Sequence, residues 1–426
     1  MTAGYSDYIV VGLSHRTAPV SVRERFAVQA EHLPAALLAM RARPGVEDAM
    51  LVSTCNRVEW YLVTADPAAG TSSGASFFAG TLPGAVPGLQ VRRGPEAIRH
   101  LFQVTGGLDS LVVGETQILG QVRAAFAAAQ AAGTVGPHLD ALVRAALAAG
   151  RRIRRETGIG NGAPSVPSAA VARASRVLGT LAGRRVLIVG AGEMGEATVR
   201  AFIRAGARDV VVANRTVEAA RAAAAAVGGV VGTFSRLDNE VRRADIVITS
   251  TAAPRPILDA ATVAGATCNR ATPLLIIDIA VPRNVDPECR RLPGVCLCDI
   301  DTLLDGASQP PDGRKDTVRR AERLVDAEVA AYLRARAARS AAPVIAAACA
   351  DAEAIADREW ARARGRLRAL SAGEEEVIRR VLRRVVHKVL HRPIVALAEA
   401  AGDGRTGGRR FGERVSAEER APGRPV

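Results

Sequence analysis

The sequence predicts a multidomain α/β protein with an N-terminal α+β domain, a central doubly wound parallel sheet and a C-terminal all-helical domain. Three observations indicate this. The 426 residues suffice for roughly two to four domains. The middle of the chain alternates continuous apolar runs with amphipathic stretches, as parallel strands covered by helices on both faces do. The last quarter carries apolar residues at three- and four-residue steps, the period of a helix.

The N-terminal block, residues 1–160, contains both strand-like apolar runs and stretches with helical periodicity, and is expected to form the α+β domain. Strand-like runs are YIVVGL near its start and the pair AMLVS and VEWYLV, which flank the residues TCNR. A stretch rich in Gly, Ser, Pro and Ala, residues 65–88, is expected to be a flexible connection. Helices are expected near residues 32–43, 116–132 and 138–157.

The central block, residues 161–308, is expected to form the parallel sheet. It contains six apolar runs of strand length, separated by stretches with helical periodicity. The runs cover residues 186–190, 209–215, 230–234, 245–251, 274–279 and 295–299.

The third block, residues 309–400, begins after the breaker QPPDG and carries helical apolar stripes. These helices are too few to form a large core of their own, so we expect their stripes to be buried on a second copy of the chain. The block is therefore predicted to be a helical dimerisation domain that makes a homodimer. The Gly- and Arg-rich tail, residues 401–426, is expected to be disordered.

Composition narrows the classes of protein. No apolar window is long enough to span a membrane and no signal peptide is evident, so we expect a cytoplasmic protein with no membrane association. The six cysteines are too scattered for a metal site or a disulfide framework, and no metal is expected. The net charge of +14 favours a polyanionic partner such as nucleic acid. Nearly all the basic residues are arginine, so an arginine-biased genome explains the charge equally well.

A glycine-rich turn is the sharpest local signal. It follows a predicted strand and opens a predicted helix, where backbone N–H groups bind a pyrophosphate, so the central block is expected to be a Rossmann-like dinucleotide-binding domain. At the end of the second strand the chain has no carboxylate, and Arg215 could pair with a 2′-phosphate, which favours NADP over NAD. The expected cofactor-binding residues are Gly190, Ala191, Gly192, Glu193, Met194, Gly195, Asn214, Arg215 and Thr216.

Cys55 lies in the pentapeptide STCNR between two predicted strands. Polar neighbours and Arg57 two residues later are surroundings that favour the reactive thiolate, although single cysteines are more often inert core residues. His100 is a candidate base or orienting group, with a structural role as the alternative.

A third polar segment runs from Gly107 to Gln121. Gln117 and Gln121 lie four residues apart and share a helix face, while Ser110 and Glu115 precede that helix. The segment could form one wall of a polar pocket, or its side chains could only cap the helix and face solvent.

Together these segments resemble the glutamyl-tRNA reductase family, from about Gly12 to Leu397. The resemblance rests on seven motifs in order: GLSHRTAPVSVRE, STCNR, GLDSLVVGETQILGQV, GAGEMG, ANRT, ITSTAAP and DIAVPRNVDP. It implies reduction of glutamate carried on tRNA(Glu) to glutamate-1-semialdehyde with NADPH, the first step of the C5 route to 5-aminolevulinate and porphyrins. The attacking cysteine matches Cys55, and a thioester is the implied intermediate.

The resemblance also implies roles for single residues. His100 matches an active-site histidine, and Arg57 is the expected partner of the substrate carboxylate. Arginine clusters at residues 362–368 and 379–384 could hold tRNA phosphates. Glutamate-1-semialdehyde aminotransferase is a candidate partner for handover of the aldehyde. The implied substrate contacts are Thr54, Asn56, Arg57, Ser110, Glu115, Thr116, Gln117 and Gln121, where Thr116 replaces the proline often found in the family.

Two other functions are compatible with part of the sequence. A shikimate-type NADP-dependent dehydrogenase would have a similar nucleotide domain, but would need neither STCNR nor the helical third block. A non-catalytic dimer that binds NADP or tRNA would keep the fold without needing Cys55, Arg57 and His100.

Overall fold

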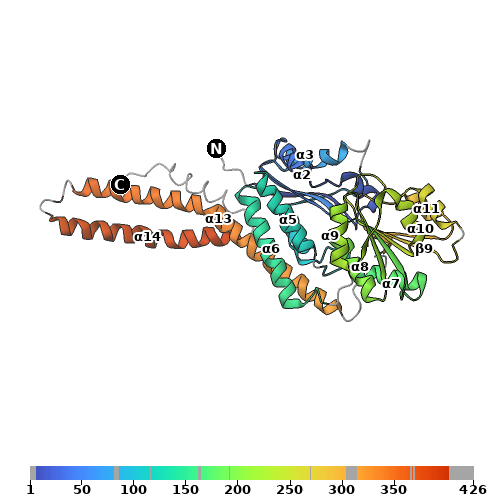
Figure 1. Ribbon diagram of the computed structural model, residues 1–426. Coiled ribbons are helices and arrows are strands. Elements are labelled where there is room, and N and C mark those ends of the chain that lie inside the picture. Colours follow the sequence, from blue (N-terminus) through green and yellow to red (C-terminus); the bar gives the residue numbers. More distant parts are fainter. Residues whose placement is uncertain are drawn as a thin grey trace. The chain divides into compact units, whose positions relative to one another are not determined.

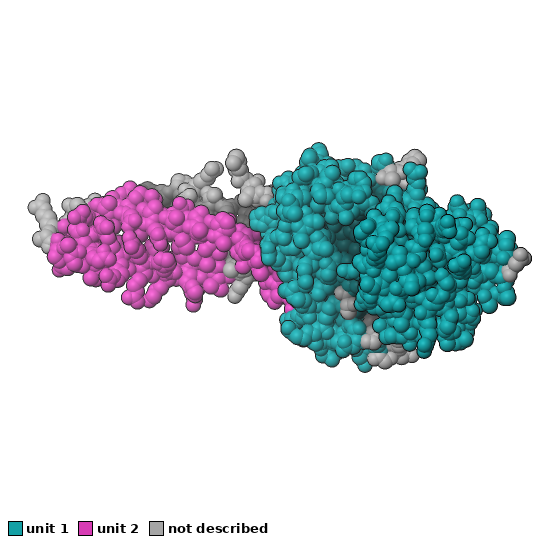
Figure 2. Space-filling model, viewed as in Figure 1, with its two compact units in different colours: residues 1–326 teal, residues 327–426 magenta. Residues whose placement is uncertain are grey.

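The computed structural model of the protein is shown in Figure 1. The chain divides into two compact units, residues 1–326 and residues 327–426 (Figure 2), which are described separately. The structure describes residues 6–80, 86–115, 117–161, 165–190, 192–268, 270–303, 314–364, 367 and 370–402, with side chains in the last range up to residue 395.

A four-stranded antiparallel sheet forms the centre of the N-terminal domain. Its order is β2-β3-β1-β4, and every residue of β3 is buried. The β1–β3 register places Ser14 opposite Arg57, so the end of β1 lies beside the turn that carries Cys55. The strands are β1 (Asp7–Ser14), β2 (Asp48–Ser53), β3 (Arg57–Thr64) and β4 (Gln90–Arg93).

Helices surround this sheet and confirm the α+β prediction. The expected helices near residues 32–43, 116–132 and 138–157 are present as α2, α5 and α6. The helical elements are α1 (Val20–Arg23), η1 (Glu24–Phe26), α2 (Leu33–Arg41), α3 (Pro67–Ala79), α4 (Gly94–Gly106), α5 (Gln117–Ala131) and α6 (Pro137–Thr157).

The prediction of a flexible connection over residues 65–88 is wrong for most of its length, because α3 occupies it. The Asp66 carboxylate accepts hydrogen bonds from the N–H groups of Ala68 and Ala69, which caps the helix. Phe78 is fully buried, with its ring centroid 5.1 Å from that of Phe26. A good cap and buried aromatic rings outweigh the helix-breaking composition. Residues 81–85 of this stretch lie outside the described residues.

The predicted parallel sheet is confirmed in the central domain, which the sequence predicts to bind a nucleotide. All its strand pairs are parallel, in the order β10-β9-β8-β5-β6-β7. Along β5, Val186 and Ile188 enter one hydrophobic cluster and Leu187 and Val189 another, so both faces are covered. The strands are β5 (Arg185–Val189), β6 (Asp209–Ala213), β7 (Val230–Val231), β8 (Ile246–Thr249), β9 (Leu274–Asp278) and β10 (Val295–Asp299).

The run at residues 230–234 is shorter as a strand than expected. Only Val230 and Val231 pair, at the edge of the sheet, and both side chains are exposed. The helical elements of this domain are α7 (Val166–Leu178), α8 (Glu193–Arg204), α9 (Val217–Val227), η2 (Phe234–Arg236), α10 (Leu237–Arg243), α11 (Ala260–Thr267), η3 (Pro287–Arg291) and α12 (Ile300–Leu303).

Two long helices, α13 (Lys315–Arg364) and α14 (Ala372–Gly402), make up the rest of the described chain. The apolar residues at helical spacing from Val318 to Tyr332 and from Ile345 to Ile355 all belong to the single helix α13. In the second unit α13 and α14 lie side by side (Figure 1), joined by an ion pair from Arg364 to Glu375, and His387 Nε2 lies 3.4 Å from Glu353 Oε1. The expected disordered tail lies outside the described residues beyond Gly402. Within the described chain, none of the helices has the length and apolar character needed to cross a membrane.

Candidate functional site

The turn that carries Cys55 is held by its neighbour Thr54. The hydroxyl of Thr54 accepts hydrogen bonds from the N–H groups of Asn56 and Arg57, each at 3.2 Å. The N–H of His15 donates to the carbonyl of Asn56 at 2.8 Å, which ties the end of β1 to the same turn. Thr54 therefore shapes the turn, in addition to its predicted role as a substrate contact.

Cys55 is partly exposed as a residue, but its thiol is poorly solvated. Burial, and then the carboxyl of Glu115, raise the pKa of the Cys55 thiol to about 12, against the opposing charge of Arg23. The expectation that the neighbouring residues favour the thiolate is therefore wrong for the resting protein. The main reason is burial of the thiol, and the Arg57 guanidinium does not offset it because it is engaged by Glu59 and Asp109.

Arg57 lies at the centre of a buried polar network. Its side chain has no exposed surface, and Nη1 donates to both carboxylate oxygens of Glu59 and to Asp109, at 3.1–3.2 Å. Nη2 donates to the main-chain carbonyl of Asp109. Burial opposes the charge on Arg57, but Glu59 and Asp109 outweigh it and raise the guanidinium pKa further. Both Nη groups of Arg57 are therefore occupied, whereas its buried Nε has no hydrogen-bond partner among the described residues and is the group left to engage a substrate carboxylate.

His100 belongs to the same network through Glu59. His100 Nε2 lies 2.9 Å from Glu59 Oε1, and the His100 ring stacks on Tyr61 with centroids 6.4 Å apart. The Tyr61 hydroxyl donates to Glu59 at 2.8 Å. Because Nε2 is engaged by Glu59, the geometry favours an orienting role for this imidazole over that of a free base.

Glu59, His100 and Asp109 are also close enough together to resemble a metal site. The Arg57 guanidinium, however, lies 3.1 Å from both carboxylates. It supplies the positive charge that a metal ion would bring, so the chemistry of this cluster does not favour a metal.

Buried polar atoms without a hydrogen-bond partner gather near the Cys55 turn. They include Asn56 Oδ1, Ser110 Oγ and His15 Nδ1. Burial, followed by the charge of Arg57, lowers the pKa of His15 to about 4, so this imidazole is neutral near pH 7. Sequence reasoning did not single out His15, although its place directly after β1 and the register opposite the STCNR turn could have indicated it.

The third polar segment forms a wall beside this turn and reaches the nucleotide domain. Burial raises the pKa of the Glu115 carboxyl, against the charges of Arg57 and Arg154. Gln117 Nε2 lies 3.8 Å from the sulfur of Met194 on α8. A predicted substrate-binding residue, Gln117, is thus in contact with a predicted cofactor-binding residue, Met194. Gln121 follows one turn later and is partly exposed, and Thr116 lies outside the described residues.

A second pocket lies at the carboxyl ends of the parallel strands. The Gly190 φ is +117°, and a Cβ there would lie 2.2 Å from the carbonyl oxygen of Ser250, so only glycine fits. Helix α8 begins after Gly192 with no side-chain cap, which leaves N–H groups for an anion. The pocket is lined by Gly190, Gly192, Asn214, Arg215, Phe234, Ser250, Thr251, Ala252, Ala253 and Ile257.

The other described cofactor residues of the prediction follow the pocket's lining residues along the chain but do not line the pocket themselves. Glu193, Met194 and Gly195 form the first turn of α8, and a Cβ on Gly195 would lie 2.9 Å from Ile188 and Ser250. Thr216 precedes α9 and is exposed, and Ala191 lies outside the described residues. These features fit a dinucleotide. Ser250 and Thr251 were not predicted individually, although they belong to the quoted motif ITSTAAP.

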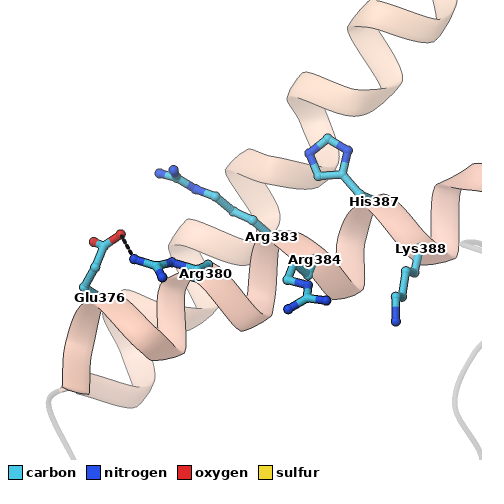
Figure 3. Close-up of a pocket in the computed structure, with 6 residues that line it drawn as sticks. All are labelled: Glu376, Arg380, Arg383, Arg384, His387 and Lys388. Atoms are coloured by element: carbon cyan, nitrogen blue, oxygen red, sulfur yellow. Dashed lines mark ion pairs between the residues drawn. The ribbon is translucent and has the colours of Figure 1, made fainter. Parts of the chain in front are cut away.

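A basic surface lies on α14 of the second unit. Figure 3 shows its side chains following one another along the helix, with Arg380 paired to Glu376 at 3.7 Å. Of the predicted cluster on α13, Arg362 and Arg364 are paired with glutamates, and residues 366 and 368 lie outside the described residues. The surface, here called the α14 basic surface, is lined by Glu376, Arg380, Arg383, Arg384, His387 and Lys388.

Comparison with known proteins matches all three blocks. Residues 11–157 match the family "Glutamyl-tRNAGlu reductase, N-terminal domain", residues 172–305 match "Shikimate / quinate 5-dehydrogenase", and residues 320–415 match "Glutamyl-tRNAGlu reductase, dimerisation domain". Glutamyl-tRNA reductase 2 of Anaeromyxobacter dehalogenans is 41% identical over 351 residues, 82% of this chain and 78% of that protein. Glutamyl-tRNA reductase of Syntrophotalea carbinolica is 39% identical over 377 residues, 87% and 85% of the two chains. The solved structure of glutamyl-tRNA reductase from Methanopyrus kandleri is 32% identical and covers 92% of this chain and 98% of its own, with a TM-score of 0.45.

Proposed function

This chain belongs to the glutamyl-tRNA reductase family and is an oxidoreductase of the C5 route to tetrapyrroles; from that premise we propose that Cys55 is its nucleophile. The observation that carries the proposal is the position of the Cys55 turn. It lies beside unpartnered buried polar groups, and the polar wall next to it meets the nucleotide domain through Gln117 and Met194. The shikimate-type alternative accounts for residues 172–305 alone.

The side chains around Cys55 suit formation of a thioester. With a thiol pKa of about 12, the proton must leave as sulfur attacks the ester carbonyl, and Glu115 is the carboxylate that most strongly influences this thiol. The ribose oxygen of the tRNA leaves with a proton, and glutamate stays on sulfur. Asn56 and Ser110 offer hydrogen-bonding groups to the glutamyl moiety, while Glu59 and His100 orient Arg57. A bound NADPH would supply the hydride that converts the thioester to the aldehyde and frees the Cys55 thiolate.

The choice of NADPH over NADH rests on Arg215. Arg215 is exposed at the rim of the nucleotide pocket, directly after Asn214, where an acid would bind the ribose hydroxyls in an NAD site. The Arg215→Ala variant is expected to bind NADPH about tenfold to a hundredfold more weakly, because one charged pair to the 2′-phosphate is lost. Its affinity for NADH, which has no 2′-phosphate, should hardly change. Titration with both cofactors measures this. Equal losses for both would show that Arg215 does not contact the 2′-phosphate.

The homodimer is proposed to form through an exposed valine stripe on α14. Val377, Val381, Val385 and Val389 recur every fourth residue, and each is more than half exposed. Exposed apolar side chains in a contiguous row favour burial against another surface, and the match of residues 320–415 to a dimerisation domain supports a second copy of the chain as that surface. Handover of the aldehyde to an aminotransferase stays a prediction from the resemblance.

The α14 basic surface is proposed to bind tRNA phosphates. Within it, only Arg380 has an acidic partner on the same surface. A triple change of Arg380, Arg383 and Arg384 to Gln is expected to weaken glutamyl-tRNA binding and to reduce the slope of log affinity against log salt by about 2–3, since each phosphate contact contributes roughly one unit. The turnover number at saturating tRNA should not change.

The matched control is Arg290→Gln with Arg291→Gln, two exposed arginines of the nucleotide domain that are paired with acids. Filter binding at several salt concentrations measures both proteins. If the slope of log affinity against log salt concentration is unchanged in the triple variant, tRNA does not bind to the α14 basic surface.

A further inference from the structure

Two consecutive residues of the N-terminal domain, Arg23 and Glu24, hold two separate parts of the nucleotide-binding domain. They lie where α1 passes into η1, a segment of seven residues. Neither residue is among the predicted site residues. Their contacts connect the cysteine turn to the domain that supplies the cofactor.

Arg23 forms the inner half of this connection. Its side chain has no exposed surface, and Nε and Nη2 both donate to the carbonyl oxygen of Cys55, at 3.2 and 3.0 Å. Nη2 also lies 2.7 Å from Asp301 Oδ1, at the start of α12 after the last strand of the parallel sheet. The second oxygen of Asp301 accepts from the N–H of Val20 at 2.6 Å. A single guanidinium thus joins the backbone of the nucleophile to the nucleotide domain.

Glu24 forms the outer half. Its carboxylate accepts from Arg283 Nε at 3.0 and 3.1 Å, from Nη2 at 2.5 Å and from the Arg283 backbone N–H at 3.0 Å. Both side chains are about four-fifths buried, where a two-pronged pair of this kind is strong and directional. The next residue, Asn284, accepts through Oδ1 from the N–H and the hydroxyl of Thr251, which lines the nucleotide pocket. The outer half therefore ends at the cofactor site.

We propose that Arg23 and Glu24 form an interdomain clasp that positions acylated Cys55 for reduction instead of hydrolysis. This inference rests on the proposed role of Cys55. A thioester that waits for its hydride can lose glutamate to water, so the fate of the acyl group depends on how closely the two domains hold their reacting parts. Arg23 and Glu24 are positioning residues, because they act through the Cys55 carbonyl and through Arg283.

The test separates acylation from the fate of the acyl group. Full-length Glu24→Gln, Arg283→Gln and the double variant are incubated with glutamyl-tRNA carrying labelled glutamate, first without NADPH and then with it. Each single variant is expected to form the acyl-enzyme at a rate within about twofold of the native protein. With NADPH present, the ratio of semialdehyde to free glutamate should fall about tenfold, because a small misplacement of the reacting groups slows hydride transfer. In the double variant this ratio should fall no further than in either single variant, since both substitutions break the same Glu24–Arg283 ion pair.

Hydrogen exchange without cofactor gives a second readout. The backbone of residues 54–57 should exchange faster in the Asp301→Asn variant, which weakens the hold of Arg23. The matched control is Arg291→Gln, which breaks an exposed pair with Glu288 in the same domain and should change neither measurement.

The outcomes distinguish the clasp from the proposed function. If the native protein forms no acyl-enzyme, the assignment of Cys55 fails and the clasp with it. If the native protein is acylated but the clasp variants yield the same ratio of semialdehyde to free glutamate as the native protein, only the clasp proposal is overturned. Equal losses in acylation and in product ratio would also overturn it, because they would indicate general damage to the fold.

Discussion

The Cys55→Ser variant is expected to form no thioester and to lose at least about a thousandfold in semialdehyde production, because an alcohol is a far weaker nucleophile than a thiol. NADPH should bind to it as to the native protein, since the nucleotide pocket takes no residue from the Cys55 turn. The measurement is mass spectrometry of the protein after incubation with glutamyl-tRNA in the absence of NADPH. The native protein should gain one glutamyl group on the peptide that contains Cys55.

Cys268→Ser is the matched control for this experiment. Cys268 is exposed on the nucleotide domain, and the same exchange of sulfur for oxygen there should leave acylation and turnover unchanged. A glutamyl adduct on another cysteine, or full activity of Cys55→Ser, would contradict the assignment of the nucleophile. Such a result would indicate that the Cys55 turn has no catalytic role.

The Glu59→Gln variant is expected to destabilise the N-terminal domain by up to about 3–5 kcal/mol, because the buried charge of Arg57 then keeps only Asp109 as a carboxylate partner. Burial opposes ionisation of Glu59, but the charges of Arg57 and His100 outweigh it and hold the pKa of this carboxyl well below its usual value of 4.5. The stability that the ionised group contributes is therefore fully present above pH 4.5 and is lost as the pH falls towards the folded-state pKa. The native protein should lose stability over this acidic range, and the variant should lose less.

Calorimetric unfolding at several pH values measures this difference. Glu288→Gln is the control, because Glu288 makes an exposed pair with Arg291 that should contribute less than about 1 kcal/mol. Should Glu59→Gln unfold with the same midpoint and the same pH dependence as Glu288→Gln, the buried network is not what holds Arg57 in place.

Local patterns in the sequence predicted the strands of the parallel sheet and most long helices, but predicted residues 65–88 wrongly and gave no prediction for β4 and α4. The six apolar runs became the six parallel strands because continuous apolar strands are stable only when both faces are covered. Helix α3 was not predicted, because Gly70 and Gly74 weaken a helix locally. Its stability comes instead from Phe77 and Phe78, which contact residues distant in the chain, Trp60 and Phe26. Such contacts cannot be read from a local window.

The electrostatic state of the candidate site was equally beyond the sequence. Cys55 and Arg57 are two residues apart and suggested a thiolate beside its counter-charge. In the structure, β3 begins at Arg57 and turns its side chain towards Glu59 and Asp109. Only the fold shows that Arg23, 32 residues before Cys55, is the guanidinium that contacts the cysteine turn.

By itself the sequence determined the order of the domains, the glycine turn for a dinucleotide and the one cysteine placed between two strands, because each depends on residues that are neighbours in the chain. The tertiary structure decided which charges meet. Arg23 reaches Asp301 across 278 residues and Glu24 reaches Arg283 across 259. An ionic contact of this kind depends on distance in space and on burial, and neither quantity is encoded in a local pattern.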